Sequence, residues 1–292
     1  MDWWALLLIQ TAVIILAPFA VAVLLGIDRI ITARMQNRVG PPVWQVLYDF
    51  FKLVGKKPML LNRPQVIFAM LFLTFSVLAF ALFVFGLDLI IIFFASAAGS
   101  VFLVVGAFSV RSPYSHMGAN RELLQITAYE PVLLLALLII GIQGGSFVVA
   151  DLYTVGDLIL TLPLVFVALI VVLVIKTQKS PYDVATAHQE IVSGPYIEYS
   201  GPYLAITKLG HWFELALIFG IFTLFFNSDN LIVSAAVKIL LIAVALLAAQ
   251  IVDNATARLT KDRMIKFTAS FGIIAIVANY ALIYILQSAG VI

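Results

Sequence analysis

Long apolar runs alternate with polar loops along the whole chain of 292 residues. Most of the runs approach the roughly 20 residues that a helix needs to cross a hydrocarbon core of about 30 Å. They cover residues 3–25, 64–85, 87–110, 124–142, 158–175, 209–226, 231–252 and 267–286. The pattern predicts an all-α polytopic membrane protein with about eight transmembrane helices, built as a single membrane domain over residues 1–292.

The basic residues fall in alternate loops. The loops after the first, third, fifth and seventh runs contain Arg29, Arg34, Arg38, Lys52, Lys56, Lys57, Arg63, Arg111, Arg121, Lys176, Lys179, Lys208, Arg258, Lys261, Arg263 and Lys266. The intervening loops 143–157 and 227–230 contain acids but no Lys or Arg, and Lys238 lies inside a run. Because cytoplasmic loops are enriched in Lys and Arg, the basic loops should face the cytoplasm and both termini the outside of the cell (plasma) membrane.

The composition excludes several classes of function. Hydrophobic residues make up 63% of the chain and charged residues only 11%, and the mean hydropathy of +1.12 does not suit a soluble domain. Without cysteine the chain lacks the usual ligands of an iron-sulfur cluster, and its three dispersed histidines argue against a haem. We therefore expect no metal or redox cofactor in this chain and, at a net charge of +2, no nucleic-acid partner.

Two long cytoplasmic insertions interrupt the apolar pattern, after the first and fifth runs. In the insertion at 27–63, the segment VWQVLYDFFKLV has polar residues at Gln45, Tyr48, Asp49 and Lys52, a spacing that predicts an amphipathic helix. Such a helix can lie in the membrane interface or form a docking surface for a cytoplasmic subunit. The sequence leaves both interpretations open.

The insertion at 176–208 combines acids, aromatic residues and two Gly-Pro pairs. Its ionisable residues include Asp183, His188, Glu190 and Glu198. The Gly-Pro pairs indicate a folded, re-entrant path. The alternative is a solvated loop whose acids balance neighbouring lysines.

Four ionisable residues lie within the apolar runs: Glu130, His211, Glu214 and Lys238. Each costs about 2.5 to 3.5 kcal/mol at a bilayer centre, so each needs a structural or functional reason. His211 and Glu214 are three residues apart and share a helix face. They are candidates for an ion pathway, or for structural pairs between helices.

Several motifs resemble one family over nearly the whole chain: DRIITARMQNRVGPP with YDFFKL, GANRELLQITAYE, and SPYDVATAHQEIVSGPYIEYSGP, followed by Glu214, Arg258 and Asp262. The family is NADH dehydrogenase subunit 1, the membrane subunit of respiratory complex I at the foot of the peripheral arm. Its counterparts occur in membrane-bound NiFe hydrogenases, sulfane sulfur reductases and formate hydrogenlyases.

The resemblance implies a subunit without a redox centre that joins an electron-transferring arm to antiporter-like proton or sodium pumps. The residues implied in an ion-coupling track are Glu130, Asp183, Glu190, Glu198 and Glu214, with His188, His211 and Lys238 as further candidates. Docking of the peripheral arm is expected to involve Arg29, Arg34, Arg38, Asp49, Lys52, Arg121, Arg258 and Asp262. No catalytic residue is expected in this chain.

Departures from the complex I pattern favour the hydrogenase branch. Where complex I subunits have a Glu-Gly-Glu run, this chain has Thr186, Ala187 and His188. The implied partners are hydrogenase-like large and small subunits, an iron-sulfur subunit and antiporter-like membrane subunits. The iron-sulfur clusters, and the NiFe centre of a hydrogenase, would belong to these partners. Ferredoxin would supply electrons indirectly. The alternatives are a quinone-site subunit of complex I and a free-standing ion transporter, although we find no internal repeat of the kind transporters contain.

Overall fold

A computed structural model describes residues 3–59 and 62–288, and the described chain forms helices joined by turns, with no β-strand in those two ranges. The long helices are α1 (Trp3–Met35), α3 (Arg63–Val84), α4 (Leu89–Phe108), α5 (Pro113–Gly144), α10 (Pro202–Thr223), α11 (Leu231–Ala255) and α12 (Lys261–Ser288). The shorter elements are α2 (Gln45–Val54), α6 (Val149–Leu152), α7 (Leu158–Thr161), α8 (Pro163–Lys176), α9 (His188–Ile191) and the 3-10 turn η1 (Gly194–Tyr196).

The all-α polytopic membrane fold predicted from the apolar runs is confirmed. Seven helices in the described ranges are long and apolar enough to cross a membrane, and α8 is a shorter apolar helix of 14 residues. Several helices also extend beyond the apolar runs. The sequence predicts a loop around Arg121, for example, but α5 begins at Pro113, so Arg121 is helical.

The span predicted at 158–175 is broken into α7 and α8. Pro163 has no backbone N–H, and Leu162 takes a non-helical conformation just before it. The buried side chain of Asn279 in α12 repairs the break: its amide donates to the carbonyl of Thr161 at 2.9 Å, and its oxygen accepts from the N–H of Leu164 at 2.8 Å. Irregular backbone is tolerated at membrane depth where protein surrounds it in this way.

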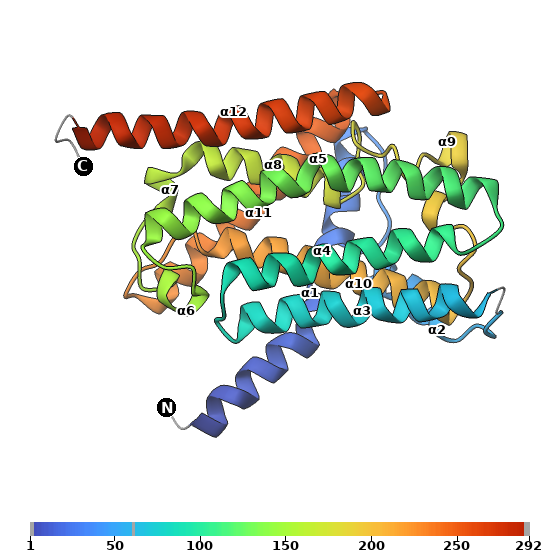
Figure 1. Ribbon diagram of the computed structural model, residues 1–292. Helices are drawn as coiled ribbons and strands as arrows, with labels where there is room; N and C mark the ends of the chain where they lie inside the picture. Colours follow the sequence, from blue (N-terminus) through green and yellow to red (C-terminus); the bar gives the residue numbers. More distant parts are fainter. Residues whose placement is uncertain (1–2, 60–61, 289–292) are drawn as a thin grey trace.

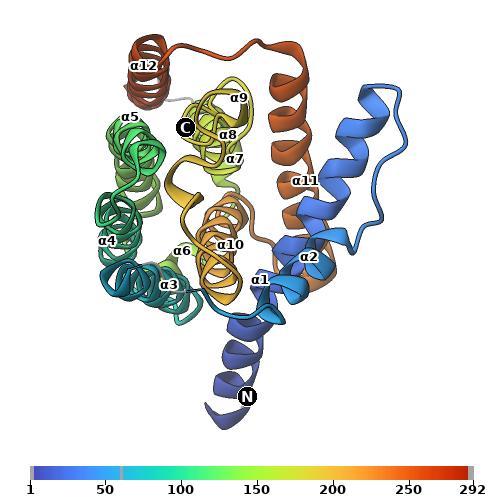
Figure 2. The same ribbon diagram turned by 90° about the vertical axis from the view of Figure 1, so that its right-hand side faces the viewer.

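The helices form an arc around a buried centre (Figures 1 and 2). Helices α3, α4 and α5 lie side by side, α12 packs against α5 and α8, and α10 lies against α3. Most residues of α8 are buried, and α11 and α1 lie on the other side of α8 and α10. Neighbouring helices therefore surround α8, the shortest of the apolar helices.

The connections that contain most of the basic residues lie at one end of the bundle, with α2 and α9 (Figure 1). The first turn of α1 and the last turn of α12 lie at the opposite end, and the N-terminal half of α1 projects from the bundle. We call the first end the basic end. This arrangement agrees with the alternation of charge in the sequence, and the cytoplasmic side of the basic end stays a prediction.

The segment at 176–208 is folded against the bundle, and its first and last residues belong to α8 and α10. Tyr182, Val184 and Tyr199 are buried. Contact between η1 and α5 is close, because a Cβ added to Gly118 would clash with the carbonyl carbon of Gly194. Gly194 itself has a φ of +53°, which favours glycine.

Helix α2 occupies most of the segment expected to be amphipathic. Val46 and Phe50 are buried against the bundle, where α2 contacts α1 and α10. Tyr48, Phe51 and Val54 are exposed. The free side of α2 is thus partly apolar, as suits a membrane interface or a protein partner.

Candidate functional site

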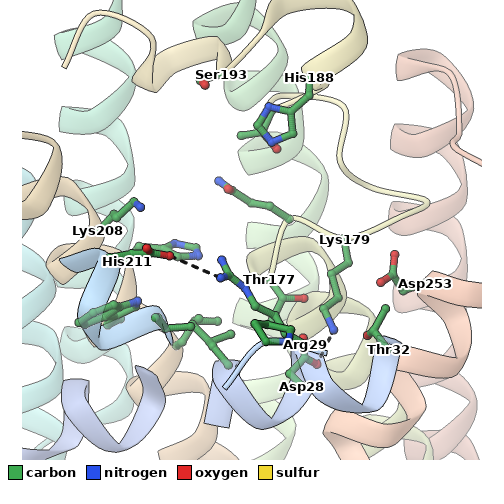
Figure 3. A pocket seen from close by; sticks show the side chains of 18 of the residues that line it. Asp28, Arg29, Thr32, Thr177, Lys179, His188, Ser193, Lys208, His211 and Asp253 are labelled. Atoms are coloured by element: carbon green, nitrogen blue, oxygen red, sulfur yellow. Dashed lines mark hydrogen bonds and ion pairs between the residues drawn. The ribbon is translucent and has the colours of Figure 1, made fainter. Parts of the chain in front are cut away.

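A cavity of about 820 Å³ opens at the basic end, between α1, α2, α10 and the segment at 176–208 (Figure 3). We call it the vestibule. Much of its lining is ionisable: Asp28, Arg29, Arg38, Asp49, Lys179, His188, Lys208, His211 and Asp253. A cavity with so many charged groups is suited to water and ions.

A buried cluster of charged and polar side chains stabilises one wall of the vestibule. Asp28 of α1 is only 5% exposed, forms an ion pair with Lys179, and accepts a hydrogen bond of 2.7 Å from Gln250 of α11. Beside it, the N–H of Ser180 donates to Asp253 at 3.1 Å. These contacts join α1, α11 and the start of the 176–208 segment.

A second charged group lies deeper, where four helices meet. Glu214 of α10 accepts from the ammonium of Lys176 in α8 at 3.0 Å and from the hydroxyl of Ser100 in α4 at 2.9 Å. Nδ1 of His211 lies 3.7 Å from the other carboxyl oxygen. The ammonium also lies 3.2 Å from Ser100 Oγ and 4.8 Å from the ring centre of Tyr129 in α5. We call these five residues the inner group.

A small cavity of about 10 Å³ adjoins the inner group and is lined by Glu122, Tyr129, Lys176 and Glu214 among others. That volume is roughly enough for one water molecule. Gln178, Tyr196 and His211 line both this cavity and the vestibule. Polar side chains therefore lead from the basic end to the centre of the bundle.

Helix α5 supplies two further carboxyl groups, Glu122 and Glu130. Each has one buried oxygen without a hydrogen-bond partner within the described ranges. Pro131 follows Glu130 inside the helix and removes one backbone donor. Buried carboxyl oxygens without partners are costly, which makes both groups candidates for water contact or proton exchange.

At the rim of the 176–208 segment, the expected track acids pair with expected docking bases. Arg258 donates to Asp183 at 2.8 Å, and Arg121 lies 2.6 Å from Glu190. Arg258 also lies 3.5 Å from Glu190. The hydrogen bond from Arg121 holds the pKa of Glu190 below its usual range, and the hydrogen bond to Asp183 raises the pKa of Arg258. We call these four residues the rim network; it ties the segment to α5 and to the α11–α12 connection.

The remaining predicted docking residues lie at the surface of the basic end. Arg29 and Asp49 lie 3.8 Å apart with side chains 52% and 43% exposed. Arg34, Arg38, Lys52 and Asp262 are exposed. They are available to a partner at that end, although only Arg29 and Asp49 of these six form an ion pair among the described residues.

Three further predicted track residues lie apart from the inner group, in addition to Glu130 and to Asp183 and Glu190 of the rim network. His188 is exposed and lines the vestibule. Glu198 is half-buried between η1 and α10. Lys238 lies towards the end of α11 opposite the basic end, where it donates to Asn227 at 3.3 Å and lies over the ring of Tyr153. The structure thus brings His211 and Glu214 together but places Lys238 elsewhere.

Sequence reasoning missed the importance of Lys176, which it counts among loop cations. Lys176 is the last residue of α8 and only 7% exposed, because the break at Pro163 leaves a short helix deep in the bundle. Glu122 and Ser100 were missed as well. The spacing of Glu122, Gln125 and Tyr129 at i, i+3 and i+7 of an apolar helix was the available signal.

No cluster of three metal-ligating His, Asp or Glu residues occurs within residues 3–59 and 62–288. The ionisable residues instead form a buried charged path inside a helical bundle. These features define a class of protein: a polytopic membrane protein with charged residues inside the bundle that connect to a cavity at its basic end.

Comparison with known proteins specifies the family. The family model described as NADH dehydrogenase matches residues 9–284. The chain therefore belongs to this family, which includes a membrane subunit of respiratory complex I.

Relatives include subunits of several membrane complexes. The chain is 31% identical to hydrogenase-4 component C of Escherichia coli over 258 residues, covering 80% of this chain and 82% of the relative. It is 30% identical to formate hydrogenlyase subunit 4 of Escherichia coli over 286 residues, covering 88% and 93%. A subunit of the NADH-quinone oxidoreductase of Thermomicrobium roseum is 28% identical over 266 residues, covering 75% and 77%.

A solved structure has the same fold. A chain of the membrane-bound sulfane sulfur reductase, an archaeal respiratory membrane complex, superimposes with a TM-score of 0.82 at 26% identity, covering 94% of this chain and 99% of that chain.

Proposed function

We propose that this chain is a non-redox membrane subunit of an ion-translocating respiratory complex. It docks a ferredoxin-oxidising peripheral arm at the basic end and couples electron transfer in that arm to ion movement. The observation that carries the proposal is the path of ionisable residues from the vestibule through His211 to the Lys176–Glu214 pair. Intramembrane charges of this kind mark ion pathways.

The proposed ion track begins at the vestibule, passes the inner group and continues through Glu122 and Glu130. Carboxyl groups in a low-dielectric interior can exchange protons near neutral pH. Asp183 and Glu190 belong to the rim network and position the 176–208 segment; Glu198, His188 and Lys238 are secondary candidates. The lack of cysteine supports placing iron-sulfur clusters, and a NiFe centre if present, in partner subunits.

One observation supports the hydrogenase or sulfur-reductase branch over a quinone-reducing complex. The relatives with 31% and 30% identity over most of both chains are components of hydrogenase-4 and formate hydrogenlyase.

The branch is tested by purifying the tagged chain in mild detergent with its partners and assaying hydrogen evolution from ferredoxin, polysulfide reduction and quinone reduction. We expect antiporter-like and hydrogenase-like subunits to copurify, with one of the first two activities. Quinone reduction would assign the chain to the complex I branch. A chain that purifies alone and transports ions would contradict the proposal.

The coupling role is tested with Glu214→Gln and Glu130→Gln in the complex. Each variant should leave electron transfer measurable while lowering the number of ions moved per electron. Asp229→Asn is the matched control, because Asp229 is an exposed acid in the loop at the opposite end. Normal coupling in Glu214→Gln would return that residue to a structural role.

The docking role is tested by charge reversal at two residues of α2. Asp49→Lys or Lys52→Glu should release the peripheral arm during purification, since Lys52 is exposed at the basic end and the side chain of Asp49 is 43% exposed there. Retention of the whole arm in both variants would favour a purely interfacial role for α2.

A further inference from the structure

The ammonium group of Lys176 occupies the centre of the inner group. Its contacts are a carboxylate oxygen of Glu214, the hydroxyl oxygen of Ser100 and the ring face of Tyr129. Oxygen ligands and an aromatic face are the groups that also bind a free monovalent cation. The position of Lys176 Nζ is therefore a cation site occupied by a charge that is covalently attached to the chain.

The fold holds this charge in place. Lys176 ends α8, a helix of 14 residues with most of its side chains buried, and the C-terminal end of a helix stabilises a cation. At the other end of α8, Asn279 satisfies the backbone groups on both sides of the break. Both features limit how far the ammonium can withdraw from the site.

We propose that Lys176 determines the ion specificity of the track: its ammonium excludes sodium from the oxygen ligands of Glu214 and Ser100, so the track moves protons. The proposal rests on the ion-coupling function given above and names its ion. A second cation at the same oxygens would be repelled by the ammonium. The adjoining cavity of about 10 Å³ has room for roughly one water and none for a hydrated metal ion.

Protons can pass where sodium cannot. A proton relayed from water in the vestibule through the ring nitrogens of His211 to the carboxylate of Glu214 yields a neutral acid and weakens the hold on the ammonium. Glu122 lines the same small cavity and has a buried oxygen without a partner in the described ranges. Lys176 can then turn towards Glu122 without losing its own proton. The proton on Glu214 passes through a water in the small cavity to the carboxylate of Glu122, and the ammonium returns to the restored carboxylate of Glu214.

The experiment compares variants of the whole complex in sealed membrane vesicles. Ion pumping per electron is measured in about 1 mM and about 100 mM sodium chloride, with choline keeping the ionic strength constant so that screening does not change. Lys176→Met removes the charge and keeps the length of the side chain. We expect pumping by this variant to rise about tenfold with sodium, because mass action fills the vacated site.

Three controls isolate the charge. Lys176→Arg keeps a cation and should show no added sodium response. Lys266→Met removes an exposed lysine of α12 and should behave as the unmodified complex does, including any sodium dependence of partner subunits. Lys176→Met combined with Glu214→Gln lacks the carboxylate and should not respond.

Equal pumping by Lys176→Met at both sodium concentrations, at whatever level, would overturn the proposal. If Lys176→Met does not assemble, Lys176→Gln, whose amide can still bond to Ser100 and Glu214, takes its place under the same criterion. A failure of the proposed ion-coupling function would give a different result, because the Glu214→Gln variant alone would then pump ions normally.

Discussion

The Lys176–Glu214 pair and the Arg29–Asp49 pair join the same kinds of charge in opposite environments. The first lies among four helices with side chains 8% and 6% exposed, and the second lies at the basic end with side chains 52% and 43% exposed. Loss of one partner leaves an uncompensated charge in the buried pair, whereas water replaces the partner in the exposed pair. The rim network is intermediate, with Arg258 and Asp183 29% and 24% exposed.

The largest effect is expected at the buried pair. Glu214→Gln leaves the ammonium of Lys176 without a counter-charge and should lower the free energy of unfolding by about 3 to 5 kcal/mol. Adding Lys176→Met should recover much of that loss, which unfolding of the purified chain in detergent will measure. Losses that simply add in the double variant would mean that the two groups do not interact.

A smaller effect is expected in the rim network. Asp183→Asn weakens the charge-assisted contact with Arg258 and should cost about 1.5 to 3 kcal/mol at most, less screening by water. Because this contact anchors the 176–208 segment, the variant should be cut by protease there faster than the parent. Arg263→Gln, an exposed residue of α12, is the control. Equal rates of cleavage in all three proteins would show that Asp183 does not anchor the segment.

The rim network also predicts a dependence on pH. Arg121 holds the pKa of Glu190 below its usual range, so this contact stabilises the fold fully above the ordinary carboxyl value of about 4.3. The contribution is lost as pH falls through the lowered pKa. Protease cleavage of the segment should therefore increase in acid, and Glu190→Gln should remove part of that increase. An unchanged acid profile in Glu190→Gln would exclude this group as the cause.

The smallest effect is expected at the exposed pair. Arg29→Gln should change the free energy of unfolding by less than about 0.5 kcal/mol, and added salt should reduce the difference further. Unfolding in low and high salt measures both. A loss as large as that of Glu214→Gln would show that exposure does not separate the two pairs.

Apolar length and loop charge were sufficient to predict the helical membrane fold and the end at which the basic loops gather, and the spacing of polar residues was sufficient to predict the helix at α2. These properties depend on sums over many residues, so single exceptions do not disturb them. The broken span was not predicted, because a proline near the start of an apolar run is equally compatible with an unbroken helix that begins at that proline. The partner that makes the break tolerable, Asn279, comes from a distant part of the chain.

The site was predicted in part for the same reason. His211 and Glu214 share a helix face, and local spacing alone brings them together. The pairing of Glu214 with Lys176, and of Glu190 with Arg121, depends on how separate helices pack. In the sequence, Lys176 follows an apolar run and looks like the other lysines of the basic loops. Only its burial in the fold distinguishes it from them.

The bridge from Asn279 to the broken span has a consequence for the order in which this protein is made. Asn279 is separated from Thr161 by 118 positions in the sequence, and at about 5 to 20 residues per second a ribosome needs roughly 6 to 24 s to reach it. During that interval the carbonyl of Thr161 and the N–H of Leu164 have no permanent partner. The insertion machinery or water must therefore keep the break between α7 and α8 away from lipid until α12 is inserted. Insertion of α12 is thus the step that completes the fold.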